Sequence, residues 1–220
     1  MTPRRSLFLN LLLVLQAAAL SGAALDAAPA PAGPSLTFTP QAVEAQGLTP
    51  GGTVVWFGIG REVVEYSAVH SERQEAAAVD SQGHAVLAVP AGVPEQSVWV
   101  AVDLKTGAYA QGSPAGFSPG GFALGGGSLD QGAAAADRLL DPADFIHLLL
   151  VRPGQGAWAA TIGRGGPKDE AGPADGSLKV SFANLEALVP GVSAPAKLNA
   201  KDVLVVTHPR TMEIGILILG

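Results

Sequence analysis

Short apolar runs rich in β-branched and aromatic residues recur along this chain, with turn-forming residues between them. The clearest run is 53–60 (TVVWFGIG), which follows the turn cluster 47–52 (GLTPGG). Similar runs lie at 84–89, 97–102 and 178–182. The chain holds 28 glycines and 17 prolines, and such residues between apolar runs about 8–15 residues apart favour strands and turns over long helices. We therefore expect a mainly β fold.

The first 27 residues have the three parts of a secretory signal peptide. Arg4 and Arg5 precede a leucine-rich run over 7–20, and small residues follow over 21–27. The alternative is a membrane anchor, but the apolar run is interrupted by Asn10 and Gln16 and is shorter than the roughly 20 residues that cross a bilayer. We predict that residues 1–27 are removed and that the mature chain carries no transmembrane segment.

The mature chain is acidic and has no cysteine. Cleavage takes Arg4, Arg5 and Asp26 from the 13 basic and 19 acidic residues, which leaves a net charge of −7. Nucleic acid and anionic membranes bind clustered Lys and Arg, so neither is expected as a partner. Without cysteine there are no disulfides and no zinc-thiolate sites. Residues 28–34 (APAPAGP) form a Pro/Ala spacer, and the part that follows must be held together by its core.

Three segments carry a resemblance to a known class of module. They are GLTPGGTVVWFG at 47–58, VDSQGHAVLAVPAG at 79–92 and SVWVAVDLKTGAYA at 97–110. In strand and turn spacing this part of the chain, about 35–118, resembles the immunoglobulin-like modules of bacterial secreted and surface proteins. The resemblance implies an antiparallel β-sandwich. It implies no ligand, because the class has no motif that defines one.

A second β-rich region at 134–220 is expected after a glycine-rich linker or loop at 119–133. It is either a second domain or an extension of the same sandwich. We predict a short helix at 133–140, then a hairpin pairing 145–151 with 157–162. A second hairpin should pair 203–207 with 212–219, and its last strand, almost wholly apolar, should be buried.

One loop carries candidate metal ligands. Asp169, Glu170 and Asp175 lie in the glycine-containing stretch 168–176, and carboxylates are the oxygen ligands that calcium takes. The spacing departs from that of regular calcium loops and Lys168 adds an opposing charge, so a plain solvated turn is the alternative. Apart from calcium we expect no cofactor.

We expect an exported, non-enzymatic β-sandwich protein with a structural, adhesive or protein-binding role, in the periplasm, at the cell surface or outside the cell. Its expected partner is another envelope or extracellular protein, or a glycan. A carbohydrate-binding module is the first alternative, and it requires exposed rings among Trp56, Trp99 and Trp158. The second is a hydrolase whose site combines distant carboxylates with His147 or His208.

Overall fold

The computed structural model describes residues 33–64, 67–122, 133–135, 145–163, 167–168 and 179–220. The predicted signal peptide at 1–27 and most of the predicted spacer at 28–34 lie outside these ranges. Residues 31–220 form one compact unit. Across the described ranges there is no helix with the length and apolar character that crossing a bilayer requires.

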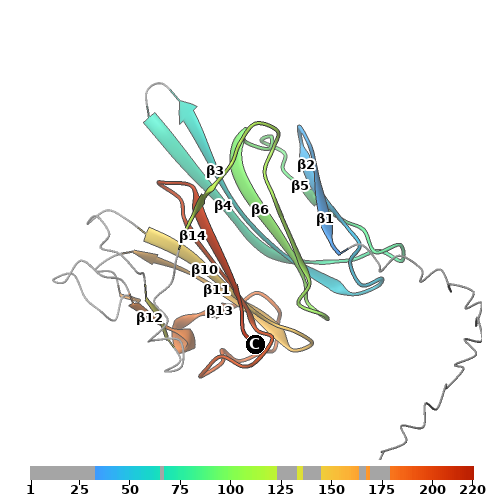
Figure 1. The fold of residues 1–220 in the computed structure, drawn as a ribbon, viewed down its shortest axis with the longest axis vertical. Helices are drawn as coiled ribbons and strands as arrows, with labels where there is room; N and C mark the ends of the chain where they lie inside the picture. The colour runs from blue at the N-terminus through green and yellow to red at the C-terminus, as the bar shows by residue number, and fades with distance from the viewer. Residues whose placement is uncertain (1–32, 65–66, 123–132, 136–144, 164–166, 169–178) are drawn as a thin grey trace, which may run out of the picture. The chain divides into compact units, whose positions relative to one another are not determined.

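The first half of this unit consists of two antiparallel sheets (Figure 1). Sheet A has the strand order β1-β2-β5, with β1 at Ser35–Thr39, β2 at Ala42–Gln46 and β5 at Ala85–Ala88. Sheet B has the order β4-β3-β6-β7, with β3 at Thr53–Val64, β4 at Ser67–Ala78, β6 at Gln96–Asp103 and β7 at Tyr109–Gly112. Seven antiparallel strands are thus divided into sheets of three and four.

The second half forms sheet C, with the order β13-β11-β10-β14-β15-β8. Its strands are β8 (Gly120–Gly121), β10 (Phe145–Arg152), β11 (Gly156–Gly163), β13 (Glu186–Ala187), β14 (Val203–His208) and β15 (Glu213–Ile218). β8, which follows the first half in sequence, pairs in parallel with β15. β9 (Ala133–Ala135) pairs with β12 (Lys179–Ser181), which leads into the 3-10 turn η2 (Phe182–Asn184).

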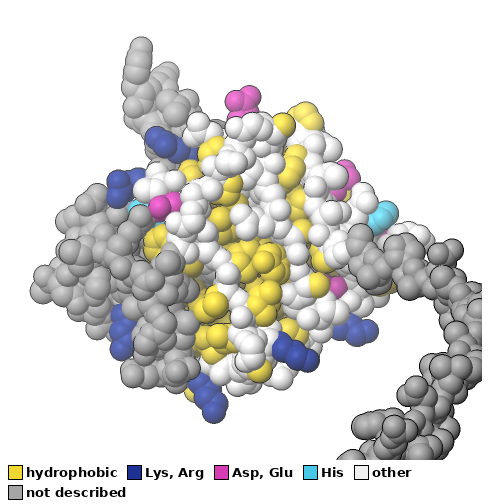
Figure 2. Space-filling view, in the orientation of Figure 1, with side chains coloured by type: hydrophobic (Ala, Val, Ile, Leu, Met, Phe, Trp, Pro, Cys, Tyr) yellow, Lys and Arg dark blue, Asp and Glu magenta, His cyan; other side chains and the backbone are white. Residues whose placement is uncertain are grey.

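Sheets B and C are covered on both faces. One face of sheet B packs on sheet A around Trp56, Trp99 and Leu87. Its other face packs on sheet C around Phe57, Val100 and Leu149. The far face of sheet C is covered by a third cluster that includes the following residues: Phe122, Val180, Phe182 and Leu185. On the face seen in Figure 2, hydrophobic side chains gather in the middle and charged ones lie towards the margin.

This layering explains the continuous apolar runs in the sequence. A strand with one face in water alternates apolar and polar residues, whereas a strand covered on both faces has no position that must be polar. In β6 the seven residues from Ser97 to Asp103 are all buried, and all six residues of β14 are buried. The core between sheets B and C joins the two halves, so the second β-rich region extends the packing of the first.

Most of the strands expected from sequence are present, including both C-terminal hairpins. Two expectations are wrong. Residues 133–135 form β9 rather than the start of a helix, because their backbone pairs with β12. The end of β15 is not buried, since Leu217 and Ile218 lie near the open end of a strand that β8 pairs only at Glu213 and Ile214 within the described residues.

Candidate functional site

A histidine, a carboxylate and a hydroxyl meet between sheets B and C. Nδ1 of His147, on β10, lies 2.5 Å from Oε2 of Glu72, on β4. The same nitrogen lies 2.8 Å from Oγ1 of Thr161, on β11. Thr161 also donates to the carboxylate oxygens of Glu72 at 3.3 and 3.4 Å. His147 is buried, while the side chain of Glu72 is 45% exposed.

This cluster combines the residue types of a hydrolytic site, and its described contacts place the carboxylate and the hydroxyl on the same ring nitrogen of the histidine. In a hydrolytic triad one ring nitrogen of the histidine bonds the carboxylate and the other bonds the nucleophile. Here Glu72 and Thr161 share Nδ1. Partial burial raises the pKa of Glu72, and the hydrogen bond from Thr161 opposes that rise. The contacts as they stand connect two sheets.

His208 lies in a similar set of contacts at the turn between β14 and β15. Its Nδ1 is 2.7 Å from Oγ1 of Thr211 and 3.5 Å from Oε2 of Glu213. Thr211 donates a short hydrogen bond to the same carboxylate. Again the hydroxyl and the carboxylate lie against the same ring nitrogen, Nδ1. These contacts stabilise the turn between β14 and β15.

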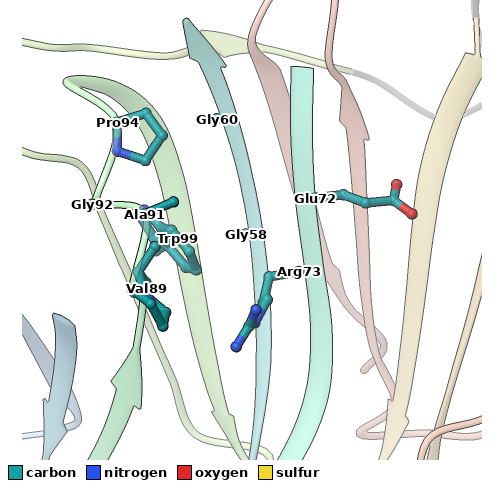
Figure 3. A pocket seen from close by; sticks show the side chains of 10 residues that line it. Gly58, Gly60, Glu72, Arg73, Val89, Ala91, Gly92, Pro94 and Trp99 are labelled. Atoms are coloured by element: carbon teal, nitrogen blue, oxygen red, sulfur yellow. The ribbon is translucent and has the colours of Figure 1, made fainter. Parts of the chain in front are cut away.

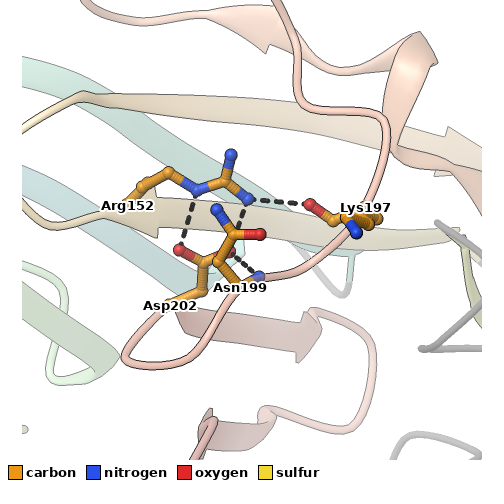
Figure 4. Close-up of polar contacts among 4 residues, drawn as sticks. All are labelled: Arg152, Lys197, Asn199 and Asp202. Atoms are coloured by element: carbon orange, nitrogen blue, oxygen red, sulfur yellow. Dashed lines mark hydrogen bonds and ion pairs between the residues drawn. The ribbon is translucent and has the colours of Figure 1, made fainter.

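A buried ion pair fixes the loop before β14 (Figure 4). Arg152 donates from Nε and Nη2 to the two carboxylate oxygens of Asp202 at 3.0 and 2.8 Å. Arg152 also donates to the carbonyl of Lys197 at 2.7 Å, and the backbone N–H of Asn199 donates to Asp202 at 2.8 Å. The hydrogen bonds to Asp202 raise the pKa of Arg152. The pair connects the end of β10 to the loop before β14, so both side chains have a structural role.

Asp103, at the end of β6, holds two turns of the first half. Its carboxylate accepts hydrogen bonds from the backbone N–H groups of Thr49 at 2.5 Å, Lys105 at 2.8 Å and Thr106 at 3.2 Å. Burial opposes the ionisation of Asp103, but the hydrogen bonds together hold its pKa below the ordinary value. Like the Arg152–Asp202 pair, this is a structural use of a buried charge.

All three tryptophans are buried. The exposed fractions are 0% for Trp56, 4% for Trp99 and 3% for Trp158. Trp56 and Trp99 belong to the core between sheets A and B, and Trp158 belongs to the core on the far face of sheet C. None of them presents the broad exposed ring on which a sugar stacks.

A pocket of about 230 Å³ opens beside Trp99, where the edges of sheets A and B meet (Figure 3). Its walls come from β3, β4, β6 and the segment after β5, and its lining residues include the following: Gly58, Gly60, Arg73, Val89, Pro90, Ala91, Pro94 and Trp99. Trp99 donates from its indole N–H to Ser97 at 2.9 Å. The indole N–H of Trp99 is therefore bonded within the protein, and the residue contributes its aromatic ring to the pocket wall.

An exposed apolar strand end lies on β15. Ile218 is 53% exposed and Leu217 is 37% exposed. Val86, on the edge strand β5, is 61% exposed and is the remaining large apolar side chain that is exposed among the described residues. Exposed apolar residues on an open strand edge favour pairing with another chain.

The predicted calcium ligands Asp169, Glu170 and Asp175 lie outside the described residues, and the calcium site remains a prediction. Their neighbour Lys168 pairs with Glu186 at 2.6 Å, which lowers the pKa of that glutamate. Among the described residues no three His, Asp or Glu side chains are arranged to hold a metal ion.

Sequence reasoning named His147 and His208 but not their carboxylate partners. Glu213 could have been found, because it lies five residues from His208 on the other strand of a predicted hairpin. Glu72 lies 75 positions before His147, and no spacing rule connects them. The pocket beside Trp99 was also missed, since it depends on how two sheet edges meet.

No protein-family model matches the chain, and no curated protein matches it. Among solved structures, the chain is similar to red sea bream transglutaminase, with 13% identity over 84% of this chain and 30% of that chain and a TM-score of 0.23. It is also similar to a tetra-tandem repeat in the extending region of a large adhesion protein, with 14% identity over 84% of this chain and 46% of that chain and a TM-score of 0.24. The chain spans less than half the length of either structure, and at these TM-scores neither similarity identifies a function.

Proposed function

We propose that this protein is an exported, non-enzymatic β-sandwich protein that binds another protein in the periplasm, at the cell surface or outside the cell. The end of β15 carries the proposal. Leu217 and Ile218 are exposed there, and within the described residues β8 pairs with β15 only at Glu213 and Ile214. An extended segment of a partner can add to such an edge through backbone hydrogen bonds, with the apolar side chains supplying contact area.

The use of the buried charges elsewhere supports a binding role over catalysis. Arg152, Asp202 and Asp103 are engaged in ion pairs or turn hydrogen bonds. The described contacts of His147 and His208 connect strands and turns through one ring nitrogen, Nδ1. These charged and polar groups therefore stabilise the fold, which supports a role in which the protein surface binds a partner.

The immunoglobulin-like character of 35–118 is part of the proposal. Sheets A and B divide seven antiparallel strands into three and four, and constant-type immunoglobulin domains have the same number of strands in two sheets. In those domains the fourth strand belongs to the same sheet as the first, second and fifth strands. Here the fourth strand, β4, pairs instead with β3 in sheet B. A carbohydrate-binding role receives less support, because it needs an exposed ring and Trp56, Trp99 and Trp158 are buried.

Binding of labelled mature protein to isolated native envelopes tests the binding class. We expect saturable binding that disappears when the envelopes are first treated with protease. Binding that survives protease and is displaced by released envelope glycans would replace the proposal with the carbohydrate alternative. Turnover of envelope material by the purified protein would replace it with the hydrolase.

A further inference from the structure

The pocket beside Trp99 is built around a cross-strand row of three residues. Gly58 of β3 lies between Trp99 of β6 and Arg73 of β4 in the strand register. A Cβ atom added to Gly58 would lie 2.3 Å from a carbon of the Trp99 ring, so the indole lies against the glycine backbone. Gly60, two residues further on the same face, also carries no side chain. The Trp99 ring therefore fills the space beside Gly58, and both glycines line the pocket.

The lining of the pocket is mostly apolar, and its two charged residues, Glu72 and Arg73, are neighbours on β4. Val89, Pro90, Pro94 and Trp99 supply aliphatic and aromatic walls. Arg73 supplies the positive charge, and Figure 3 places its guanidinium on the side of β4 that faces Trp99 and Val89. The same figure shows the carboxylate of Glu72 directed to the opposite side of β4, where it meets His147.

Arg73 keeps hydrogen-bonding capacity for a ligand. Its Nε lies 3.3 Å from Oε2 of Glu75, and its Nη2 donates to the carbonyl of Ala88 at 3.3 Å. Both distances are beyond the usual 2.7–2.9 Å of a charge-assisted hydrogen bond, and neither contact uses Nη1. The side chains of Arg73 and Glu75 are 44% and 41% exposed, so a competing carboxylate can reach the guanidinium from solvent.

The size of the pocket restricts the ligand further. Its volume of about 230 Å³ is below the roughly 300–1,000 Å³ of sites for drug-sized ligands. We propose that the pocket binds a small monocarboxylate with a single apolar ring, the ring lying beside Trp99 among the proline and valine side chains and the carboxylate pairing with Arg73. This site is separate from the β15 edge, and it stands or falls independently of the protein-binding role.

Calorimetric titration of the mature protein with phenylacetate, benzoate and cyclohexanecarboxylate tests the proposal, with tryptophan fluorescence as a second readout. We expect saturable one-to-one binding of at least one acid and weaker binding of its uncharged amide. Arg73→Gln should weaken binding of the acid about tenfold or more, the effect of losing a hydrogen bond between charged groups, and leave binding of the amide unchanged. Glu75→Gln should tighten binding of the acid, because it removes the internal competitor.

Two further variants locate the site. Ala91→Phe changes an exposed residue at the pocket rim and should abolish binding of both acid and amide. Lys105→Gln, which removes an exposed cation from a different turn, should have no effect. Unchanged thermal unfolding of each variant confirms that the fold is intact. Failure of all three acids to bind saturably, or equal binding to wild type and Arg73→Gln, would overturn the proposal.

Discussion

Nδ1 of His147 and Oε2 of Glu72 lie 2.5 Å apart and join β10 of sheet C to β4 of sheet B. A double-mutant cycle with Glu72→Gln and His147→Gln measures what this contact contributes to stability. Because Glu72 is 45% exposed, we expect a coupling free energy at the low end for contacting residues, about 0.5–1 kcal/mol. Denaturant unfolding of the four proteins provides the values.

The matched control replaces Arg73, the neighbour of Glu72 that points to the other face of β4. Arg73→Gln combined with His147→Gln should give additive losses. Coupling of equal size in both cycles would mean that the Glu72–His147 contact does not account for the effect.

The strands were largely predictable, because a strand that is buried on both faces appears in the sequence as a continuous apolar run. β6 and both C-terminal hairpins follow from such runs and from the turns beside them. β2 was missed, since its sequence AVEAQ is short and contains two alanines and a glutamate that also suit a helix. The parallel pairing of β8 with β15 involves two glycines that carry no pattern.

The candidate sites were less predictable than the strands. The carbohydrate-binding alternative requires an exposed tryptophan ring, and all three tryptophans are buried. The Glu72–His147 contact and the pocket beside Trp99 arise where separate sheets meet. Periodicity within one strand shows which face is apolar, but it does not tell which other sheet will cover that face.

Breaking the buried pair Arg152–Asp202 should lower the free energy of unfolding more than a substitution at the surface does. The side chain of Asp202 is fully buried and that of Arg152 is 13% exposed. Asp202→Ala removes the carboxylate partner of a largely buried guanidinium, which keeps its hydrogen bond to the carbonyl of Lys197. The expected loss is about 3 kcal/mol in the free energy of unfolding. Asp202→Asn retains an oxygen for the Asn199 N–H and should lose less. Equal stability of Asp202→Ala and wild type in urea unfolding would refute this account.

We expect the stability of the protein to decrease at low pH, because Asp103 then becomes protonated. Its folded pKa is lowered from an unfolded value of about 3.9, so its contribution is present above about pH 4 and is lost as the pH falls through the folded pKa. We expect Asp103→Asn to lose about 1–3 kcal/mol at pH 7 and to approach wild type below pH 4. Urea midpoints at pH 7, 5 and 3 test this, with Glu95→Gln on an exposed loop as the control. A difference that does not change with pH would contradict the role given to the charge.

Calcium binding at Asp169, Glu170 and Asp175 remains a prediction from sequence. If the three carboxylates bind the ion, excess calcium should stabilise the protein by about 1–3 kcal/mol through mass action, which raises the melting temperature by several degrees. Replacing the three by Asn, Gln and Asn should remove the shift. The same melting temperature in millimolar calcium and in chelator would identify the loop as a solvated turn.

The most direct test of the proposed function compares envelope binding by two charge variants of exposed apolar strands. Leu217→Lys with Ile218→Lys changes the open end of β15, and Val86→Lys changes the edge strand β5. Charged residues on an exposed strand edge prevent pairing with another chain. We expect the β15 variant to lose protease-sensitive binding to native envelopes, while the Val86 variant binds as wild type does. Undiminished binding by the β15 variant would contradict the central claim.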